Sequence, residues 1–344
     1  MKIENFEIGK KVFIIAELSA NHGHDINIVK ETIKAAKKSG ADAIKTQTYT
    51  ADTLTIDCDN SYFKLSSGTI WDGRTLYDLY SEAFTPWEWN KEIKEYANEL
   101  GLIFFSTPFD KTAVDFLEEL DVPVYKVASF EILDIPLIEY IASKGKPIFI
   151  STGIASLSDI EEAVEACKRL GNNQIVLLKC TSSYPAKIED ANLYTLPNMK
   201  ETFGVEVGLS DHTLGITVPV VSIPLGAKVI EKHFIIDKSN GGPDASFSLE
   251  PSEFKQMVDA VRDAEKALGK VDYCMNEKKQ KNRLIGRSLF VVEDVKTGEV
   301  FTENNVRSIR PGNGLSPKYL KDILGKTAKQ GIKRGTPVEW NFIE

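Results

Sequence analysis

Short apolar runs alternate with amphipathic stretches from residue 11 to residue 235. Each run is rich in β-branched residues and ends in a polar residue, and a stretch of helical periodicity follows it. Near-continuous apolar strands that alternate with helices are typical of a parallel sheet covered by helices. The runs span 11–18, 41–49, 102–109, 122–129, 146–153, 175–185, 205–213 and 227–235. Eight such units in about 250 residues are the size of a closed (β/α)8 barrel, which we predict for residues 1–270.

Helix start and stop signals support this count. The stretch 26–39 carries apolar residues at helical spacing and ends at Gly40. The stretch 87–100 follows a proline and stops at a glycine, and 250–268 likewise begins at Pro251 and ends before a glycine. Proline at the first turn and glycine just past the last one are typical helix boundaries.

One connection is too long for an ordinary strand-to-helix loop. Residues 50–85 separate the second predicted strand from its helix and include Tyr62, Phe63, Trp71 and Tyr77. A long loop at the catalytic end of a barrel favours a functional lid, and a surface-packed Ω-loop is the structural alternative.

The pattern changes after residue 270. We predict a polar linker over 271–286 and a small β-rich domain over 287–344, joined at an exposed boundary. The predicted short strands of this domain are R-S-L-F-V-V, D-V-K-T-G-E-V, V-R-S-I-R-P-G-N-G and K-R-G-T-P-V-E-W.

Composition narrows the classes of partner. The chain has a net charge of -8, which argues against nucleic acid and anionic membrane surfaces as partners. An anionic substrate therefore needs locally placed cations. No apolar run approaches the ~20 residues that span a bilayer, and the first residues show no apolar run of the signal-peptide type, so we expect neither a membrane span nor secretion. Four scattered cysteines form neither a metal motif nor a disulfide framework, so we expect a cytoplasmic protein.

Polar side chains end all eight predicted strands. The active site of a (β/α)8 barrel is built at the carboxyl ends of its strands, so these side chains should meet. Each serine or threonine taken alone is more often a strand cap or turn former, but together with a lysine they suit a phosphorylated anion. The residues are Glu17, Lys45, Gln47, Thr107, Lys126, Ser129, Ser151, Ser182, Tyr184, Ser210, His212 and His233.

Two of the four histidines end consecutive strands, in V-G-L-S-D-H-T and V-I-E-K-H-F. A single histidine at such a place more often caps a strand or packs in the core. Two imidazoles at adjacent strand ends can hold one divalent metal and leave coordination positions open for substrate or water. The pattern therefore predicts a metal site formed by His212 and His233.

The ordered motifs resemble the sialic-acid synthase family over nearly the whole chain. They are I-I-A-E-L-S-A-N-H, A-I-K-T-Q-T-Y, Y-K-V-A-S-F-E, I-S-T-G-I-A, C-T-S-S-Y-P, V-G-L-S-D-H-T, V-I-E-K-H-F, G-G-P-D-A-S-F-S-L and R-P-G-N-G. The resemblance implies a transferase that condenses phosphoenolpyruvate with an amino-sugar aldehyde to give a nine-carbon keto acid. It also implies that the small C-terminal domain is an antifreeze-like (SAF) domain.

The same resemblance assigns roles residue by residue. It implies that His212 and His233 hold manganese, cobalt or magnesium, and that Glu17 is a catalytic carboxylate. It implies a phosphoenolpyruvate cradle made of Thr107, Lys126, Ser129, Ser151, Ser182 and Ser210, with Lys45, Gln47 and Tyr184 lining the same pocket. Asp244 matches a residue that faces the sugar, and Arg310 matches an arginine that reaches the partner's site in a domain-swapped homodimer. The expected catalytic residues are Glu17, Lys126, Tyr184, Asp244 and Arg310.

Within the family, two segments distinguish among sugars. W-D-G-R-T-L-Y-D-L-Y (71–80) and C-T-S-S-Y-P (180–185) look most like the branch that makes pseudaminic acid from a 2,4-diacetamido-2,4,6-trideoxy-hexose of altrose type. Ser182 stands where N-acetylneuraminate synthases usually have asparagine, which argues against N-acetylmannosamine. Precursors of N-acetylneuraminate, legionaminic acid and spore-coat sugars stay open as alternatives.

Two other classes compete with this interpretation. A Schiff-base aldolase would use Lys45, Lys126 or Lys179 as nucleophile and would need no metal. A non-catalytic carbohydrate-binding protein would use the barrel as a scaffold. The complete set of polar strand ends, both histidines included, argues against the second.

Overall fold

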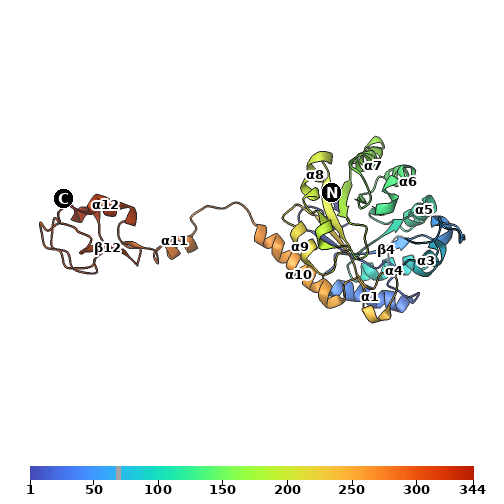
Figure 1. The fold of residues 1–344 in the computed structure, drawn as a ribbon, viewed down its shortest axis with the longest axis horizontal. Helices are drawn as coiled ribbons and strands as arrows, with labels where there is room; N and C mark the ends of the chain where they lie inside the picture. The colour runs from blue at the N-terminus through green and yellow to red at the C-terminus, as the bar shows by residue number, and fades with distance from the viewer. Residues whose placement is uncertain (67–70) are drawn as a thin grey trace. The chain divides into compact units, whose positions relative to one another are not determined.

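Parallel strands close into a barrel that helices surround (Figure 1), as the (β/α)8 prediction requires. The computed structural model describes residues 1–66 and 71–344, and within them eight strands form the barrel in the cyclic order β10-β3-β4-β5-β6-β7-β8-β9. Their bounds are β3 (Phe13–Glu17), β4 (Ala43–Thr48), β5 (Ile103–Pro108), β6 (Tyr125–Val127), β7 (Ile148–Ser151), β8 (Ile175–Cys180), β9 (Glu206–Asp211) and β10 (Val229–His233).

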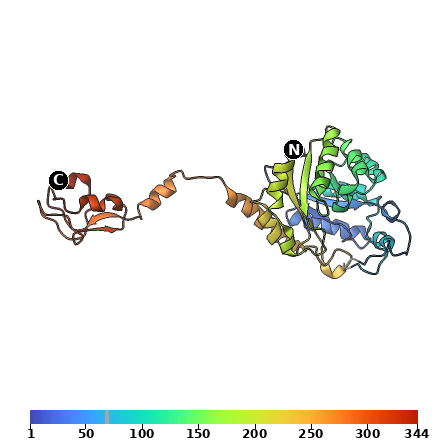
Figure 2. The same cartoon turned by 45° about the horizontal axis from the view of Figure 1, so that its top comes forward.

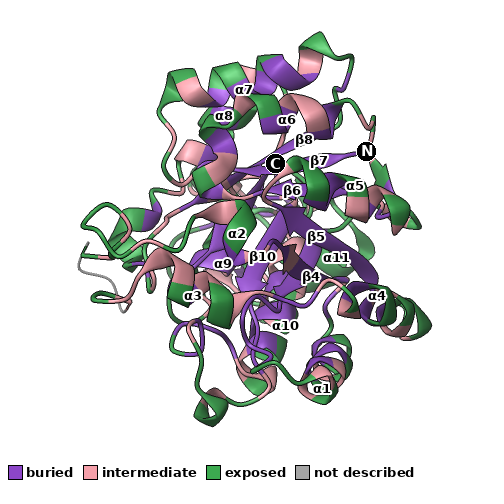
Figure 3. Ribbon diagram, turned by 90° about the vertical axis from the view of Figure 1, so that its right-hand side faces the viewer, coloured by how far each residue is buried: buried purple, intermediate pink, exposed green. Residues whose placement is uncertain are grey.

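Side chains of alternating strand positions fill the barrel interior. Near the amino ends of the strands the rings of Phe13, Phe105 and Phe149 pack against one another, with centroids 5.9 and 6.2 Å from that of Phe149. Successive strand residues point to opposite faces, so residues two positions apart share a face. Further along the strands, the face that points into the barrel carries Glu17 on β3 and Lys45 on β4. Figure 3 shows β4 and β5 as buried. The interior is therefore apolar at one end and charged at the other.

Amphipathic helices cover the outside of the barrel. In α1 the side chain of Asp25 accepts a hydrogen bond from the backbone of Asn27, and Val29, Ile33 and Ala36 face the core. The predicted helices at 26–39, 87–100 and 250–268 are all confirmed. The main outer helices are α1 (Ile26–Lys38), α4 (Trp89–Glu99), α5 (Lys111–Glu119), α6 (Ile135–Ala142), α7 (Leu157–Arg169), α8 (Thr195–Phe203), α9 (Thr217–Ser222) and α10 (Pro251–Leu268). Figure 2 shows them outside the strands from a second side.

Short elements complete the barrel unit. A hairpin of β1 (Lys2–Ile3) and β2 (Phe6–Glu7), which the sequence pattern did not predict, places the ring of Phe6 4.7 Å from that of Phe13. It therefore packs against the amino end of β3. Single turns of 3-10 helix follow three strands as η1 (Ser129–Leu133), η2 (Ile188–Ala191) and η3 (Lys238–Asn240).

The long connection at 50–85 is partly helical. It contains α2 (Ala51–Leu54) and α3 (Leu76–Ala83), and between them Lys64 and Thr75 form an antiparallel bridge. A backbone hydrogen bond from Leu65 to the carbonyl of Arg74 extends this pairing. Residues 67–70 lie outside the described residues.

The chain divides into two compact units, Met1–Gly269 and Lys270–Glu344, each with its own hydrophobic core. The second unit pairs β11 (Ser288–Val291) with β12 (Val306–Ile309) in antiparallel fashion and also contains η4 (Pro317–Tyr319), α12 (Leu320–Ile323) and η5 (Trp340–Phe342). The segment expected to be an extended linker contains the helix α11 (Glu277–Arg283), whose first turn is capped by Asn276.

Two of the predicted strands of the second unit are wrong. The segments 294–300 and 333–340 form isolated bridges, which pair Val295 with Ile332 and Phe290 with Pro337. Gly298 and Gly335 have φ of +78° and +87°, and Pro337 has no amide hydrogen to donate, so neither segment sustains a ladder. Across residues 1–66 and 71–344, no helix is long and apolar enough to cross a membrane.

Candidate active site

A polar pocket lies at the carboxyl ends of the barrel strands. Its wall includes most of the residues that the sequence predicted for the site, and three that it did not: Ala128, Cys180 and Glu231. The predicted residues in the wall are Glu17, Lys45, Gln47, Thr107, Lys126, Ser129, Ser151, Tyr184, Ser210, His212 and His233. The carboxyl ends of the strands therefore bring together side chains that are far apart in the sequence.

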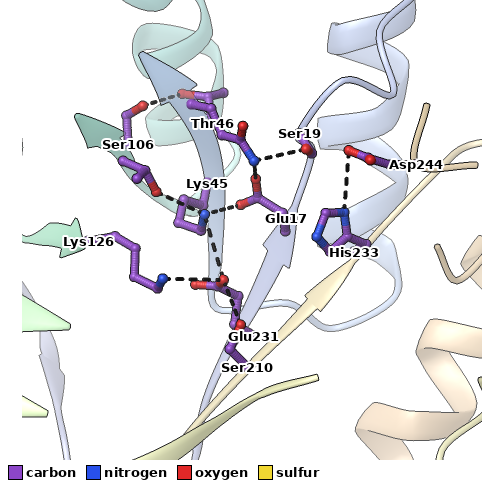
Figure 4. A network of polar contacts seen from close by, with 12 residues as sticks. Glu17, Ser19, Lys45, Thr46, Ser106, Lys126, Ser210, Glu231, His233 and Asp244 are labelled. Atoms are coloured by element: carbon purple, nitrogen blue, oxygen red, sulfur yellow. Dashed lines mark hydrogen bonds and ion pairs between the residues drawn. The ribbon is translucent and has the colours of Figure 1, made fainter. Parts of the chain in front are cut away.

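One carboxylate organises the cations of the pocket. Glu231 Oε1 lies 3.7 Å from the Nζ of Lys45 and 3.9 Å from that of Lys126, and it accepts a hydrogen bond of 3.1 Å from Ser210 (Figure 4). Burial alone would raise the pKa of Glu231, but the two lysines outweigh it and lower that pKa. Glu231 is thus held as an anion between two cations.

Glu17 forms the other half of this network. Its Oε2 lies 2.5 Å from the Nζ of Lys45, and its Oε1 accepts a hydrogen bond of 3.0 Å from Gln47. Burial raises the pKa of Glu17 to about 7 in spite of Lys45. For Lys45, burial would lower the pKa, and the charges of Glu17 and Glu231 reverse the direction and raise it. Each of the two groups therefore favours the charged form of the other, against the effect of burial.

Hydroxyl groups line the side of the pocket near β6, β7 and β8. Ser129 Oγ accepts a hydrogen bond of 3.1 Å from the backbone of Gly153, while Ser151 Oγ is buried without a protein partner. Ser182 does not line the pocket; its Oγ lies beside Gly153, where a Cβ would overlap it, and 3.9 Å from the Sγ of the pocket residue Cys180. Hydroxyls beside Lys45 and Lys126 form a cradle suited to the oxygens of a phosphate and a carboxylate.

The two predicted metal ligands lie side by side. The ring centroids of His212 and His233 are 5.3 Å apart. His212 Nδ1 lies 3.0 Å from the carbonyl oxygen of Thr181, and His233 Nδ1 is buried without a hydrogen-bond partner, 3.8 Å from Asp244 Oδ2. Within residues 1–66 and 71–344, no group of three histidine, cysteine, aspartate or glutamate side chains is placed to hold a metal. A metal here would have two protein imidazoles.

Asp244 stands at the edge of the site. Its Oδ2 accepts a hydrogen bond of 3.4 Å from the backbone of Ala20, and Ser19, which interacts with it, also accepts one from Gln47. Burial raises the pKa of this carboxyl. Asp244 therefore connects the loop after β3 to the region of His233.

Arg310 belongs to the second unit. It is exposed at the end of β12, in the loop R-P-G-N-G. Ser288 holds that loop, because its Oγ donates to the carbonyl of Pro311 and accepts from the backbone of Gly314. The arginine thus stands on a fixed loop.

Aromatic rings form one wall beside the histidines. The ring of Tyr184 lies 4.4 Å from that of His212 and 5.3 Å from that of Phe247, which in turn contacts His233 at 4.9 Å. Trp71 from the 50–85 connection extends this wall, with its ring 5.5 Å from Tyr184.

Sequence reasoning missed Glu231 because on this strand it considered only the final residue, His233. Glu231 precedes His233 by two positions, so strand alternation puts both on the interior face. Cys180 is the last residue of β8. The period of two was the signal that could have found Glu231.

Comparisons with known proteins place the chain in a family. The NeuB family model matches residues 32–273, and the SAF domain model matches residues 286–344. The chain is 51% identical to the pseudaminic acid synthase of Campylobacter jejuni, with 97% of each chain covered. It is 38% identical to the N,N'-diacetyllegionaminic acid synthase of Legionella pneumophila, over 96% of this chain and 94% of that protein.

A solved structure agrees with these sequence relatives. The N-acetylneuraminic acid synthetase of Leptospira borgpetersenii is 32% identical, with a TM-score of 0.73 over 82% of this chain and 94% of that one. The family model and the near full-length relatives show that the chain is an enzyme of the NeuB family that ends in a SAF domain.

Proposed function

We propose that this enzyme condenses phosphoenolpyruvate with a 2,4-diacetamido-2,4,6-trideoxy-hexose of altrose type to give pseudaminic acid and inorganic phosphate. The observation that carries the reaction is the cradle of Lys45, Lys126 and hydroxyls directly beside two histidines in one pocket. The sugar rests on the relatives, because identity is 51% to a pseudaminic acid synthase and 38% to a legionaminic acid synthase.

The reaction forms one carbon–carbon bond and breaks one carbon–oxygen bond. C3 of phosphoenolpyruvate attacks the aldehyde carbon, and the aldehyde oxygen takes up a proton to become a hydroxyl. The oxocarbenium carbon left at C2 then adds water, which loses a proton. The new C2 hydroxyl then gives up its proton as the bond between C2 and the phosphate oxygen breaks, so inorganic phosphate leaves with the bonding electrons and the keto acid forms. Phosphorus–oxygen bonds remain intact.

The pocket residues suit the charges that develop during these reaction steps. Lys45 and Lys126 neutralise the anionic groups of phosphoenolpyruvate, while the hydroxyls of Ser129 and Ser151 donate to their oxygens. Glu17, fixed by Lys45 and Gln47, is placed to stabilise the cationic carbon and to orient the attacking water.

We also propose that His212 and His233 hold a divalent metal such as manganese, cobalt or magnesium. The carbonyl of Thr181 can only accept, so His212 Nδ1 carries the proton and Nε2 presents its lone pair. The buried, unpartnered Nδ1 of His233 is a second free donor atom. A metal bound there would polarise the aldehyde oxygen.

Calorimetric titration with manganese tests this site. We expect His212→Ala and His233→Ala to weaken binding at least tenfold, because each removes one of two protein ligands. The exposed His24 on the loop after β3 supplies the control, and His24→Ala should bind as the parent does. Equal binding by all four proteins would show that the metal lies elsewhere or is not bound.

Phosphate release from phosphoenolpyruvate against a panel of sugars tests the substrate. We expect kcat/KM for the altrose-type sugar to exceed that for N-acetylmannosamine and for the legionaminic acid precursor by at least tenfold. Higher efficiency with either competitor would overturn the sugar assignment. No phosphate release with any of the three would overturn the condensation itself.

The Schiff-base alternative has one observation in its favour. Burial lowers the pKa of Lys126, as an amine nucleophile requires. Glu231 opposes this effect and favours the cation. Borohydride treatment with the sugar present distinguishes a Schiff-base aldolase from the proposed condensing enzyme. A Schiff base would leave a reduced, covalent adduct on Lys126, and the condensation would leave none.

We further propose that two chains form a domain-swapped homodimer in which Arg310 of one chain serves the pocket of the other. The basis is the family resemblance of R-P-G-N-G together with the fixed position of that loop on Ser288. The four cysteines are unpaired, which fits the reducing cytoplasm in which we place the enzyme.

A further inference from the structure

One aromatic side chain of the 50–85 connection reaches the active-site wall. The indole of Trp71 lies 5.5 Å from the ring of Tyr184, and its Nε1 donates a hydrogen bond of 3.3 Å to the carbonyl of Pro243. Pro243 immediately precedes Asp244, so Trp71 is held between a pocket-lining ring and the segment that carries Asp244. By contrast, Tyr62 is 90% exposed, and the hydroxyl of Tyr77 bonds to Asp52 within the same connection.

The rings form a graded wall. From the two histidines outward, His212 contacts Tyr184 and Tyr184 contacts Trp71. Phe247, which is almost fully buried, supports the wall from His233 to Tyr184. The wall therefore begins with imidazole nitrogens at the aldehyde end and finishes with an indole at the lid end.

A six-carbon aldehyde has two chemically different ends. In the proposed reaction the C1 carbonyl of the sugar lies beside His212 and His233. The far end of the sugar then extends toward the mouth of the pocket and the 50–85 connection. In a 6-deoxy sugar that far end is a methyl group. The graded wall thus matches the polarity of such a sugar along its length.

We propose that Trp71 determines selection of the 6-deoxy sugar by covering its C6 methyl. This inference rests on the proposed function, and it concerns which residue selects the sugar. The indole face can bury a methyl group, a contact that contributes through the hydrophobic effect. A hydroxyl on C6 would lose water there, and the indole N–H is already committed to Pro243, so it offers no compensating hydrogen bond.

The test compares two aldehydes that differ in one oxygen: the 2,4-diacetamido-2,4,6-trideoxy sugar and its 6-hydroxy counterpart. The measurement is kcat/KM for each, by phosphate release, in the parent, Trp71→Ala, Trp71→Phe and Tyr62→Ala. For the parent we expect about a 10- to 100-fold preference for the 6-deoxy sugar. Trp71→Ala should lose most of that preference, mainly through a raised KM for the 6-deoxy sugar.

The other variants separate selection from folding. Trp71→Phe keeps an aromatic face and should keep most of the preference, while Tyr62→Ala alters an exposed aromatic of the same connection and should match the parent. The KM for phosphoenolpyruvate should stay within about twofold throughout, because the cradle is untouched.

The outcomes are distinct for the two proposals. An equal loss with both sugars in Trp71→Ala, or an unchanged preference, would overturn the role of Trp71 while leaving the condensation intact. A parent enzyme that releases no phosphate with either sugar would overturn the proposed function and this inference with it.

Discussion

The carboxyl group of Glu131 is unusual because it is incompletely hydrogen-bonded, although it lies close to the polar residues of the active site. Its Oε2 is buried and has no hydrogen-bond partner, and burial raises the pKa of its carboxyl to about 7 although Lys126 opposes the shift. It lies in η1, two residues after Ser129. A carboxyl that is protonated when folded and ionised when unfolded makes stability depend on pH.

The sign of this dependence follows from the two pKa values. Between pH 4.5 and about 7 the folded chain binds a proton at Glu131 that the unfolded chain has released, so the free energy of unfolding falls as pH rises through that window. We expect Glu131→Gln to remove this pH dependence. Between pH 5 and pH 8 the free energy of unfolding of the parent should fall by roughly 1 to 3 kcal/mol more than that of the variant. Urea unfolding at several pH values measures it.

A matched variant guards against a general charge effect. Glu303→Gln changes an exposed glutamate of the second unit and should leave the pH curve parallel to that of the parent. Parallel curves for Glu131→Gln as well would mean that Glu131 is ionised in the folded enzyme.

At the scale of elements, the turn from β7 to α7 is fitted closely to its neighbours. The backbone of Gly153 donates to Ser129 Oγ, and a Cβ at this position would overlap Ser182 Oγ and lie 2.7 Å from Ser129 Oγ. The turn can approach two hydroxyls from different strand ends because it has no side chain.

We expect Gly153→Ala to raise the KM for phosphoenolpyruvate about 10- to 100-fold, because the added methyl displaces Ser129 Oγ from the pocket wall and Ser182 Oγ beside the turn. Steady-state kinetics measures it, with circular dichroism to confirm the fold. Gly331→Ala is the control, since the closest atom to a Cβ there is 3.9 Å away, and it should behave as the parent. An unchanged KM in Gly153→Ala would show that neither Ser129 nor Ser182 holds phosphoenolpyruvate.

At the scale of the whole molecule, the two units have separate cores, and the glycines of R-P-G-N-G fix the loop that carries Arg310. A Cβ on Gly314 would overlap the carbonyl oxygen of Leu289, and one on Gly312 would lie 2.5 Å from that of Arg283. A closely packed loop backbone gives Arg310 a defined starting point, and its guanidinium can bind a polar substrate.

Subunit complementation tests whether that guanidinium acts across a dimer. Glu17→Gln and Arg310→Ala chains should each be inactive, and mixing them with subunit exchange should restore part of the activity. In a swapped dimer one mixed pocket has both defects and the other has neither. Mixing Glu17→Gln with the double variant Glu17→Gln/Arg310→Ala should restore nothing. Confirmed exchange without recovery in the first mixture would show that Arg310 acts in its own subunit or not at all.

The sequence by itself determined the barrel and the end of it that carries the site. Strand runs, helix caps such as Asp25 and the turn residues beside them are local features of the sequence. Eight repeats of such a strand and helix unit are typical of a closed (β/α)8 barrel. Polar residues at the strand ends, such as Lys45, Lys126 and Ser151, follow from the same pattern. Each of these inferences needs only the neighbours of a residue along the chain.

Only the tertiary structure decided which of those residues touch. Register between β3, β4 and β10 brings both Glu17 and Glu231 within ion-pair distance of Lys45, a relation that spans three strands. Aromatic residues of the 50–85 connection look alike in sequence, yet Trp71 reaches Tyr184 while Tyr62 faces solvent. The failed strands near Gly298 and Gly335 have the same origin, because pairing depends on a partner strand as well as on local pattern. Contacts between distant segments are fixed by barrel closure and packing, which periodicity does not encode.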